Sequence, residues 1–174
     1  MYQIVNILGF NSPEWLIANN GCQLAGCIAA GIYATNSPDA CHYITDHSKA
    51  DVAVLEDNKQ LIKYKNCKIG TLKNIVVYAE KPEEDLVASF KSEGISVYHW
   101  PDFLALGTQV PSTEVTTRSD AIRPGNCSTL IYTSGTTGPP KAVMISHDNI
   151  TWTTRNLATF YPPFDHEDRI ISYL

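Results

Sequence analysis

The sequence predicts an α/β protein whose layers are built on a parallel β-sheet. Short apolar runs, each bounded by turn residues, alternate with stretches of helical pattern between residues 3 and 99. Two of these helical stretches begin with a Ser-Pro pair, at Ser12-Pro13 and at Ser37-Pro38, which is typical of a helix start. The chain has 174 residues, 44% of them hydrophobic and 18% charged, so it has the composition of a globular domain with a sizeable core.

The first strand and the first helix are expected close to the N-terminus. Gln3–Leu8 is a short apolar run that ends at Gly9, and it predicts a buried strand. Ser12 is the expected N-cap of a helix that runs from Pro13 to about Ala30. Small residues fall at helical spacing in this stretch and would let the helix lie close against a sheet: Ala18, Cys22, Ala25 and Ala29.

Further elements follow from the same patterns of apolar runs, caps and breakers. Up to residue 99 they are, in order, a strand at Ile32–Thr35, a helix that starts at Asn36–Asp39 and ends near Ser48, a strand at Asp51–Leu55, a weak helix at Asn58–Lys65, a strand at Asn74–Tyr78, a short helix at Leu86–Ser92 and a strand at Ile95–His99. Beyond it they are a helical turn at Phe103–Leu106, a polar connector at Pro111–Thr117, a strand at Cys127–Tyr132, a strand at Lys141–Ser146, a helix at His147–Thr159 capped by Ser146, a proline turn at Tyr161–Phe164 and a last strand at Arg169–Leu174.

Composition and spacing exclude several classes of function. The net charge is −5 and no basic block occurs, which argues against a nucleic-acid partner. The five cysteines include no CxxC pair and no zinc spacing with histidine, so reduced thiols are expected. Trp15–Pro38 lacks charge but is interrupted by Asn, Gln, Gly and Pro residues, and a buried helix is favoured over an integral membrane segment. The dinucleotide fingerprint GxGxxG is absent.

The stretch Tyr132–Lys141, which reads YTSGTTGPPK, is the candidate functional site. Glycine lets the backbone approach an anion closely, and successive free N–H groups in such a loop form an anion-binding concavity. The Thr and Ser hydroxyls add donors, and Lys141 adds a positive charge, so the stretch predicts a polyphosphate cradle. The Walker A pattern GxxxxGK[ST] does not fit, because Gly135 and Gly138 are too close and Ala142 follows the lysine. An ordinary surface loop with a solvated Lys141 is the alternative.

The motif YTSGTTGPPK, followed by AVMISHDN, resembles the phosphate loop of the acyl-adenylate-forming, AMP-binding superfamily. Residues 6–57, from NILGFNSPEW to VLED, and the segment HDNITWTTRN are similar to long-chain fatty acyl-CoA synthetases, with the bubblegum type as the best match. The resemblance implies that residues 1–174 are an incomplete fragment of the large N-terminal domain of such an enzyme, a layered parallel-sheet subdomain with its phosphate loop at 132–141 and without the C-terminal lid domain.

The resemblance also implies a reaction and a set of site residues. A fatty acid, ATP and coenzyme A would give acyl-CoA, AMP and diphosphate through an acyl-adenylate, with Mg²⁺ as the metal. Lys141 would contact the phosphates as a catalytic residue, and Thr133 or Thr136 would touch Mg²⁺. The residues expected to hold the phosphates are Thr133, Ser134, Gly135, Thr136, Thr137, Gly138 and Lys141. One departure stands in the motif, since Ala142 replaces the usual Gly; it would be strained at positive φ and tolerated at the start of a strand.

Several readings of the parent protein stay open at this point. The runner-up within the class is an enzyme that adenylates a short-chain, aryl or amino acid, and the alternative outside it is a truncated product that only binds a partner. The fragment alone is expected to be inactive. The resemblance implies a cytoplasmic protein, with peripheral contact to a membrane such as the endoplasmic reticulum in the full-length enzyme.

Overall fold

A seven-stranded sheet organises the computed structural model, which describes residues 3–67, 69–133, 138–160 and 165–169. The strand order is β5-β4-β3-β1-β2-β6-β7, and all neighbours pair in parallel except β6 and β7, which are antiparallel. The strands are β1 (Ile4–Leu8), β2 (Ile28–Ile32), β3 (Val52–Leu55), β4 (Asn74–Val77), β5 (Ser96–His99), β6 (Cys127–Thr133) and β7 (Lys141–Ser146). The predicted α/β class with a mainly parallel sheet is confirmed.

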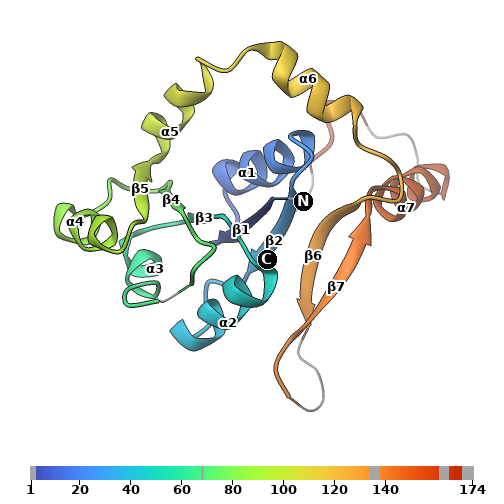
Figure 1. The fold of residues 1–174 in the computed structure, drawn as a ribbon. Helices are drawn as coiled ribbons and strands as arrows, with labels where there is room; N and C mark the ends of the chain where they lie inside the picture. The colour runs from blue at the N-terminus through green and yellow to red at the C-terminus, as the bar shows by residue number, and fades with distance from the viewer. Residues whose placement is uncertain (1–2, 68, 134–137, 161–164, 170–174) are drawn as a thin grey trace.

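Helices cover both faces of this sheet, as Figure 1 shows. The helices are α1 (Pro13–Leu24), α2 (Pro38–Ser48), α3 (Asn58–Ile62), α4 (Glu84–Ser92), α5 (Trp100–Gly107), α6 (Ser112–Asp120) and α7 (His147–Phe160). Side chains of α2, α3 and α4 share one apolar core with the strands, around Ile44, Leu61 and Phe90. Side chains of α1 and α5 pack into the core on the other face, around Cys22 and Phe103. The three layers bury both faces of the central strands, which explains their near-continuous apolar sequences.

The first helix is shorter than the sequence predicts, and the expectation that it reaches Ala30 is wrong. The backbone N–H of Gly26 donates to Gln23 O at 3.0 Å and that of Cys27 donates to Cys22 O at 3.0 Å, with Gly26 at φ +71. This is the Schellman pattern that ends a helix at a left-handed glycine. The chain then continues as β2 four residues earlier than the expected Ile32–Thr35 strand, so the small residue Ala29 belongs to a strand and not to a helical stripe. The uncharged stretch Trp15–Pro38 is therefore a helix and a strand, and not the single buried helix that the sequence predicts.

A helix also replaces the polar connector expected at Pro111–Thr117. Helix α6 buries no residue, so it has none of the apolar periodicity from which helices are predicted. Its threonines bond back to the preceding turn, with Thr116 Oγ1 3.1 Å from Ser112 O and Thr117 Oγ1 2.7 Å from Thr113 O. In Figure 1 the segment that carries α5 and α6 arches over α1, and it joins β5, at one edge of the sheet, to β6 near the other edge.

The last described helix begins where the sequence predicts. Ser146 Oγ accepts a hydrogen bond from Asn149 N at 3.1 Å, and Ser146 N donates to Asn149 Oδ1 at 3.0 Å, which is a reciprocal N-terminal cap. The expected turn at Tyr161–Phe164 lies outside the described residues, as does the expected last strand except for Arg169. Among the described residues, no helix is both long and apolar enough to cross a membrane.

Candidate functional site

The candidate site lies on the hairpin formed by β6, residues 134–140 and β7, called here the β6–β7 hairpin. Because β6 runs parallel to β2, its carboxyl end reaches the same edge of the sheet as the carboxyl ends of the other parallel strands, the edge where α/β proteins bind ligands. Thr133 closes β6 and Lys141 opens β7, and the two are direct partners in the antiparallel register. In Figure 1 the described strands β6 and β7 run past α2.

The two faces of the hairpin differ in burial. Tyr132, which is paired with Ala142, is 8% exposed and belongs to the core beneath α2, and Ala142 packs against the same core. Thr133 and Lys141, one residue closer to the tip, are exposed. Since neighbouring residues of a strand alternate between faces and cross-strand partners share one, the Thr133 hydroxyl and the Lys141 ammonium leave the hairpin on the same face. They can therefore approach one ligand together.

The structure places three of the predicted phosphate-binding residues and leaves four undescribed. Gly138 is exposed at φ +98, a backbone conformation that L side chains rarely adopt, and no atom of the described residues lies within 4 Å of where a Cβ would stand. Its requirement for glycine is therefore conformational, as expected where a loop turns its amides toward an anion. Thr133 and Lys141 flank the loop as described above. Ser134, Gly135, Thr136 and Thr137 lie outside the described residues.

Ala142 stands in regular β-structure. It pairs with Tyr132 within β7, and it is not among the described non-glycine residues with positive φ, which are Lys49 and Asn66. Of the two outcomes considered for the missing glycine, the structure supports the one in which Ala begins a strand and is tolerated.

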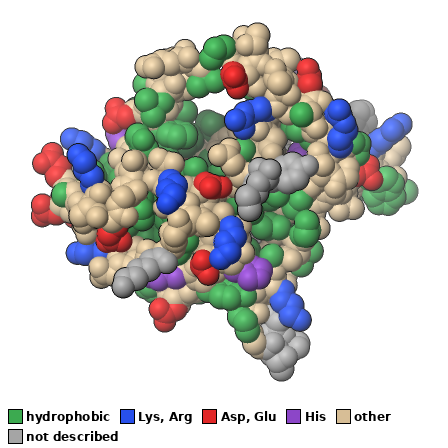
Figure 2. Space-filling view, in the orientation of Figure 1, with side chains coloured by type: hydrophobic (Ala, Val, Ile, Leu, Met, Phe, Trp, Pro, Cys, Tyr) green, Lys and Arg blue, Asp and Glu red, His purple; other side chains and the backbone are tan. Residues whose placement is uncertain are grey.

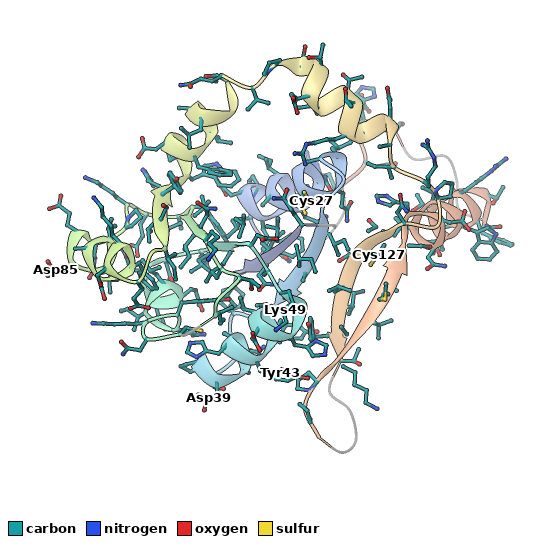
Figure 3. The ribbon with its side chains drawn as sticks, in the orientation of Figure 1. Cys27, Asp39, Tyr43, Lys49, Asp85 and Cys127 are labelled. Carbon is teal, nitrogen blue, oxygen red and sulfur yellow. The ribbon has the colours of Figure 1, made fainter. Side chains whose placement is uncertain are left out.

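Helix α2 contacts both arms of the hairpin, a feature the sequence does not reveal. Tyr43 Oη donates to Pro140 O at 3.1 Å, beside the exit of the loop. His47 Nδ1 lies 2.9 Å from Tyr132 Oη, beside its entrance. Figure 3 shows Tyr43 on the side of α2 that faces the hairpin. Tyr43 and His47 are four residues apart on one helical face, but no local pattern indicates partners that lie 97 and 85 positions away.

Tyr132 is held as a neutral phenol. Burial raises the pKa of Tyr132 above its ordinary value, and a hydrogen bond with Ser48 opposes this only in part. The hydroxyl donates to Ile44 O at 3.4 Å and lies 2.9 Å from His47 Nδ1. The residue therefore links β6 to α2 through its hydroxyl while its ring fills the core.

The crevice where such sheets often bind ligands is filled in this chain. The order β5-β4-β3-β1-β2 reverses direction between β1 and β3, and this switch point is a common ligand site. Here Tyr78 Oη donates to Phe10 O at 3.3 Å, and Phe10 N donates to Glu56 Oε2 at 3.1 Å. Gly9 lies directly beneath Tyr78, where a Cβ would overlap the Tyr78 hydroxyl. Because these groups occupy the switch point, the β6–β7 hairpin is the better candidate for the ligand site.

Metal-binding groups are scarce in the part of the chain that the structure describes. No group of three or more His, Cys, Asp or Glu residues there could hold a metal ion. Mg²⁺ prefers a few protein oxygens together with phosphate oxygens and water, so a single hydroxyl such as that of Thr133 fits this kind of site. Thr136, the other expected ligand, lies outside the described residues. On the face in Figure 2, Lys and Arg side chains are scattered among Asp and Glu without a continuous basic patch.

Comparison with known proteins gives matches along nearly the whole chain. The family model described as AMP-binding enzyme matches residues 2–174. The long-chain-fatty-acid–CoA ligase ACSBG2 of Gallus gallus is 41% identical over 177 residues, which cover 98% of this chain and 22% of the relative. The long-chain-fatty-acid–CoA ligase ACSBG1 of Mus musculus is 40% identical over 175 residues, covering 98% of this chain and 23% of the relative. The chain thus spans about a quarter of the length of the curated relatives it matches.

Solved structures share the fold at lower sequence identity. The anthranilate CoA ligase AuaEII in complex with anthranoyl-AMP superposes with a TM-score of 0.64 at 22% identity, over 88% of this chain and 27% of that one. The adenylation domain of the carboxylate reductase from Mycobacterium chelonae gives a TM-score of 0.67 at 21% identity, over 90% of this chain and 25% of that one. The layered sheet is therefore the architecture found in adenylate-forming proteins.

Proposed function

The chain belongs to the AMP-binding enzyme family, and on this premise we propose that it forms the phosphate-binding part of an ATP-dependent long-chain fatty acid–CoA ligase. The observation that carries the proposal is the β6–β7 hairpin, where Thr133 and Lys141 share an exposed face at the ligand edge of the sheet. Identities of 41% and 40% to two long-chain-fatty-acid–CoA ligases support the substrate class, and they confirm the resemblance to the bubblegum type.

The proposed reaction has two steps. In the first, a carboxylate oxygen of the fatty acid attacks the α-phosphorus of ATP, the bond to the β-phosphate oxygen breaks, and diphosphate leaves from an acyl-adenylate. In the second, the thiol of coenzyme A attacks the acyl carbonyl and AMP leaves, while the thiol proton passes to solvent or a base. The first step brings an anion to a polyanion and releases another, so its main requirement is the stabilisation of negative charge.

The residues of the hairpin fit that requirement. Lys141 supplies a mobile positive charge, and its exposed position leaves the ammonium available to the β- and γ-phosphates. Gly138, with its positive φ, gives the loop the backbone geometry of an anion-binding turn, and Ser134–Thr137 complete the proposed cradle. Mg²⁺, when bound with ATP, would neutralise phosphate charge, and Thr133 and Thr136 are the residues proposed to reach it.

The proposal assigns this chain one part of an active site. Because residues 1–174 span about a quarter of the relatives, the fatty-acyl pocket, the adenine site and the C-terminal lid are proposed to lie in other parts of a longer polypeptide. The complete enzyme is proposed to be cytoplasmic, with peripheral contact to the endoplasmic reticulum membrane. The 174-residue chain alone is proposed to bind ATP weakly and not to turn over.

Exchange between ATP and radiolabelled pyrophosphate tests the proposal, since it reports acyl-adenylate formation directly. The complete polypeptide that carries this segment should catalyse exchange with palmitate and not with benzoate, acetate or amino acids, and the 174-residue chain should catalyse none. A preference for benzoate would favour an aryl-acid ligase, an activity for which the fold is also used. The absence of exchange with every acid would show instead that the product is not an adenylating enzyme.

A further inference from the structure

We propose that Tyr43 and His47 of α2, together with Tyr132 of β6, are positioning residues that fix the two arms of the β6–β7 hairpin around the phosphates. The inference rests on the proposed function and extends it, because it assigns a task in that reaction to a helix that carries none of the signature residues. His47 contacts the rings of both tyrosines, Tyr43 bonds to Pro140 after the loop, and Tyr132 lies just before it. None of the three is proposed to touch substrate.

The first contact holds the exit of the loop. Tyr43 Oη donates to Pro140 O at 3.1 Å, and Tyr43 is half-buried, so the hydrogen bond is partly protected from water. Pro140 immediately precedes Lys141 in the chain. A shift of the Pro140 carbonyl would therefore displace the backbone from which the Lys141 side chain extends.

The second contact holds the entrance. Tyr132 Oη meets His47 Nδ1 at 2.9 Å and Ile44 O at 3.4 Å, and Tyr132 is the residue directly before Thr133. His47 is exposed, so its hydrogen bond with Tyr132 must compete with water. The position of Tyr132 is nevertheless restricted, because its hydroxyl meets both His47 and Ile44 and its ring is buried. The backbone at Thr133 is restricted with it.

The two contacts are coupled through their rings. Tyr43 and His47 stack with centroids 5.4 Å apart and an angle of 26° between their planes. His47 and Tyr132 meet edge to face, at 5.8 Å and 79°. Such ring contacts favour one mutual arrangement of the three side chains. The entrance and the exit of the loop therefore both contact one aromatic cluster. The distance between them depends on this cluster as well as on the pairing of β6 with β7.

Helix α2 is itself a firm support for this cluster. Ser37 Oγ accepts from Ala40 N at 3.3 Å at its start, and Lys63 Nζ donates to Ala34 O at 2.7 Å and to Asn36 O at 2.8 Å just before it. Thr45 Oγ1, in its middle, donates to Cys41 O at 2.8 Å and lies 3.2 Å from the buried Tyr64 hydroxyl. Because α2 is held in place, the cluster on it can restrict the hairpin before ATP binds. The phosphate-binding donors then lose less conformational entropy on binding, which assists catalysis.

Hydrogen exchange of the 174-residue chain tests the anchoring without any need for activity. Tyr43→Phe and Tyr132→Phe keep the rings and remove one hydroxyl each, and the amides of residues 131–146 should then exchange about three- to tenfold faster, as expected for the loss of one hydrogen bond. Tyr98→Phe is the matched control, because Tyr98 lies on β5 at the opposite edge of the sheet. Unchanged exchange in the hairpin of both variants would overturn the proposal.

Kinetics of the complete polypeptide separate positioning from mere packing. Tyr43→Phe should lower kcat/KM for ATP in pyrophosphate exchange by about three- to tenfold. The KM for palmitate and the rate of thioester formation from supplied acyl-adenylate should not change. A looser hairpin with unchanged ATP kinetics would show that the cluster is only structural and would overturn the inference. If the unmodified polypeptide exchanges pyrophosphate with no acid, the proposed function fails and the positioning role fails with it, whereas the hydrogen-exchange result still decides whether the cluster anchors the hairpin.

Discussion

Thr133 and Lys141 lie directly opposite each other where the β6–β7 hairpin opens, and their side chains project from the same exposed face. The motif alone places them eight residues apart, at the two ends of a loop. The antiparallel register makes the two residues neighbours, because Thr133 pairs directly with Lys141. A hydroxyl and an ammonium are thereby presented side by side to a ligand above the loop.

Replacement of Lys141 by Ala in the complete polypeptide should slow acyl-adenylate formation about tenfold to a hundredfold, because a charge that stabilises the departing diphosphate is lost. Thioester formation from supplied acyl-adenylate should be almost unaffected, since no diphosphate leaves in that step. Single-turnover kinetics of the two half-reactions measure both effects. Lys91→Ala, at an exposed site on α4, is the control. Equal losses in the two half-reactions would indicate that Lys141 acts through structure.

Replacement of Ala142 by Gly should destabilise this chain by about 0.5–1 kcal/mol. Ala142 has ordinary strand geometry and packs against the core, so glycine would add freedom to the unfolded chain and remove a packed methyl group. Urea denaturation followed by tryptophan fluorescence gives the free energy of unfolding. An increase in stability would mean that position 142 requires a glycine conformation after all.

The elements with strong apolar runs were predictable from sequence, and those defined by tertiary context were not. The strand at Asp51–Leu55 and the helix that ends near Ser48 are confirmed almost to the residue, because an uninterrupted apolar run and a Ser-Pro cap are local signals. Helix α6 has no apolar stripe and gave no such signal. The expected end of α1 near Ala30 is wrong because Gly26, which falls inside the expected helix, has a positive φ that ends the helix.

For the candidate site, sequence was sufficient to locate the hairpin but not its support. The composition of Tyr132–Lys141 indicates a loop that binds anions, because glycines, hydroxyls and a lysine have direct chemical reasons to be there. Tyr43 and His47 have equally direct roles in the structure, yet a tyrosine and a histidine on an amphipathic helix are common. Their meaning depends on a contact with Pro140 and Tyr132 that only the packing of α2 against the hairpin creates.

Replacement of Gly9 by Ala should destabilise the chain by about 1–3 kcal/mol, because the added methyl group would overlap the Tyr78 hydroxyl and lie 2.9 Å from Glu56 Cβ. Gly21→Ala is the matched control and should stabilise it by about 0.5–1 kcal/mol, since Gly21 is an exposed position inside α1 and an added Cβ would meet no atom of the described residues within 4 Å. Thermal unfolding of the two variants measures the contrast. Similar shifts of Tm for both would contradict the tight packing between Gly9 and Tyr78.

Cys27 should react with iodoacetamide at pH 7 about tenfold faster than Cys127, although both thiols are half-buried, because the thiolate is the reactive form. A hydrogen bond with the Cys22 thiol lowers the pKa of Cys27, and the positive charge of Arg118 lowers it further, whereas burial opposes both. Burial raises the pKa of Cys127. The contrast should shrink as the pH rises above the pKa of Cys27, which is about 7, because the thiolate fraction of Cys27 then levels off while that of Cys127 still increases.

Peptide mass spectrometry after timed alkylation measures both rates in the same sample, so differences in protein folding cancel. Arg118→Gln should slow the alkylation of Cys27, because the variant removes the positive charge that favours its thiolate, and it should leave Cys127 unchanged. Cys22→Ala should slow it more, since the hydrogen bond with Cys22 is the larger of the two effects that lower the pKa. Labelling of Cys127 before Cys27 at pH 7 would contradict the contact between Cys22 and Cys27 at the end of α1, on which the difference depends.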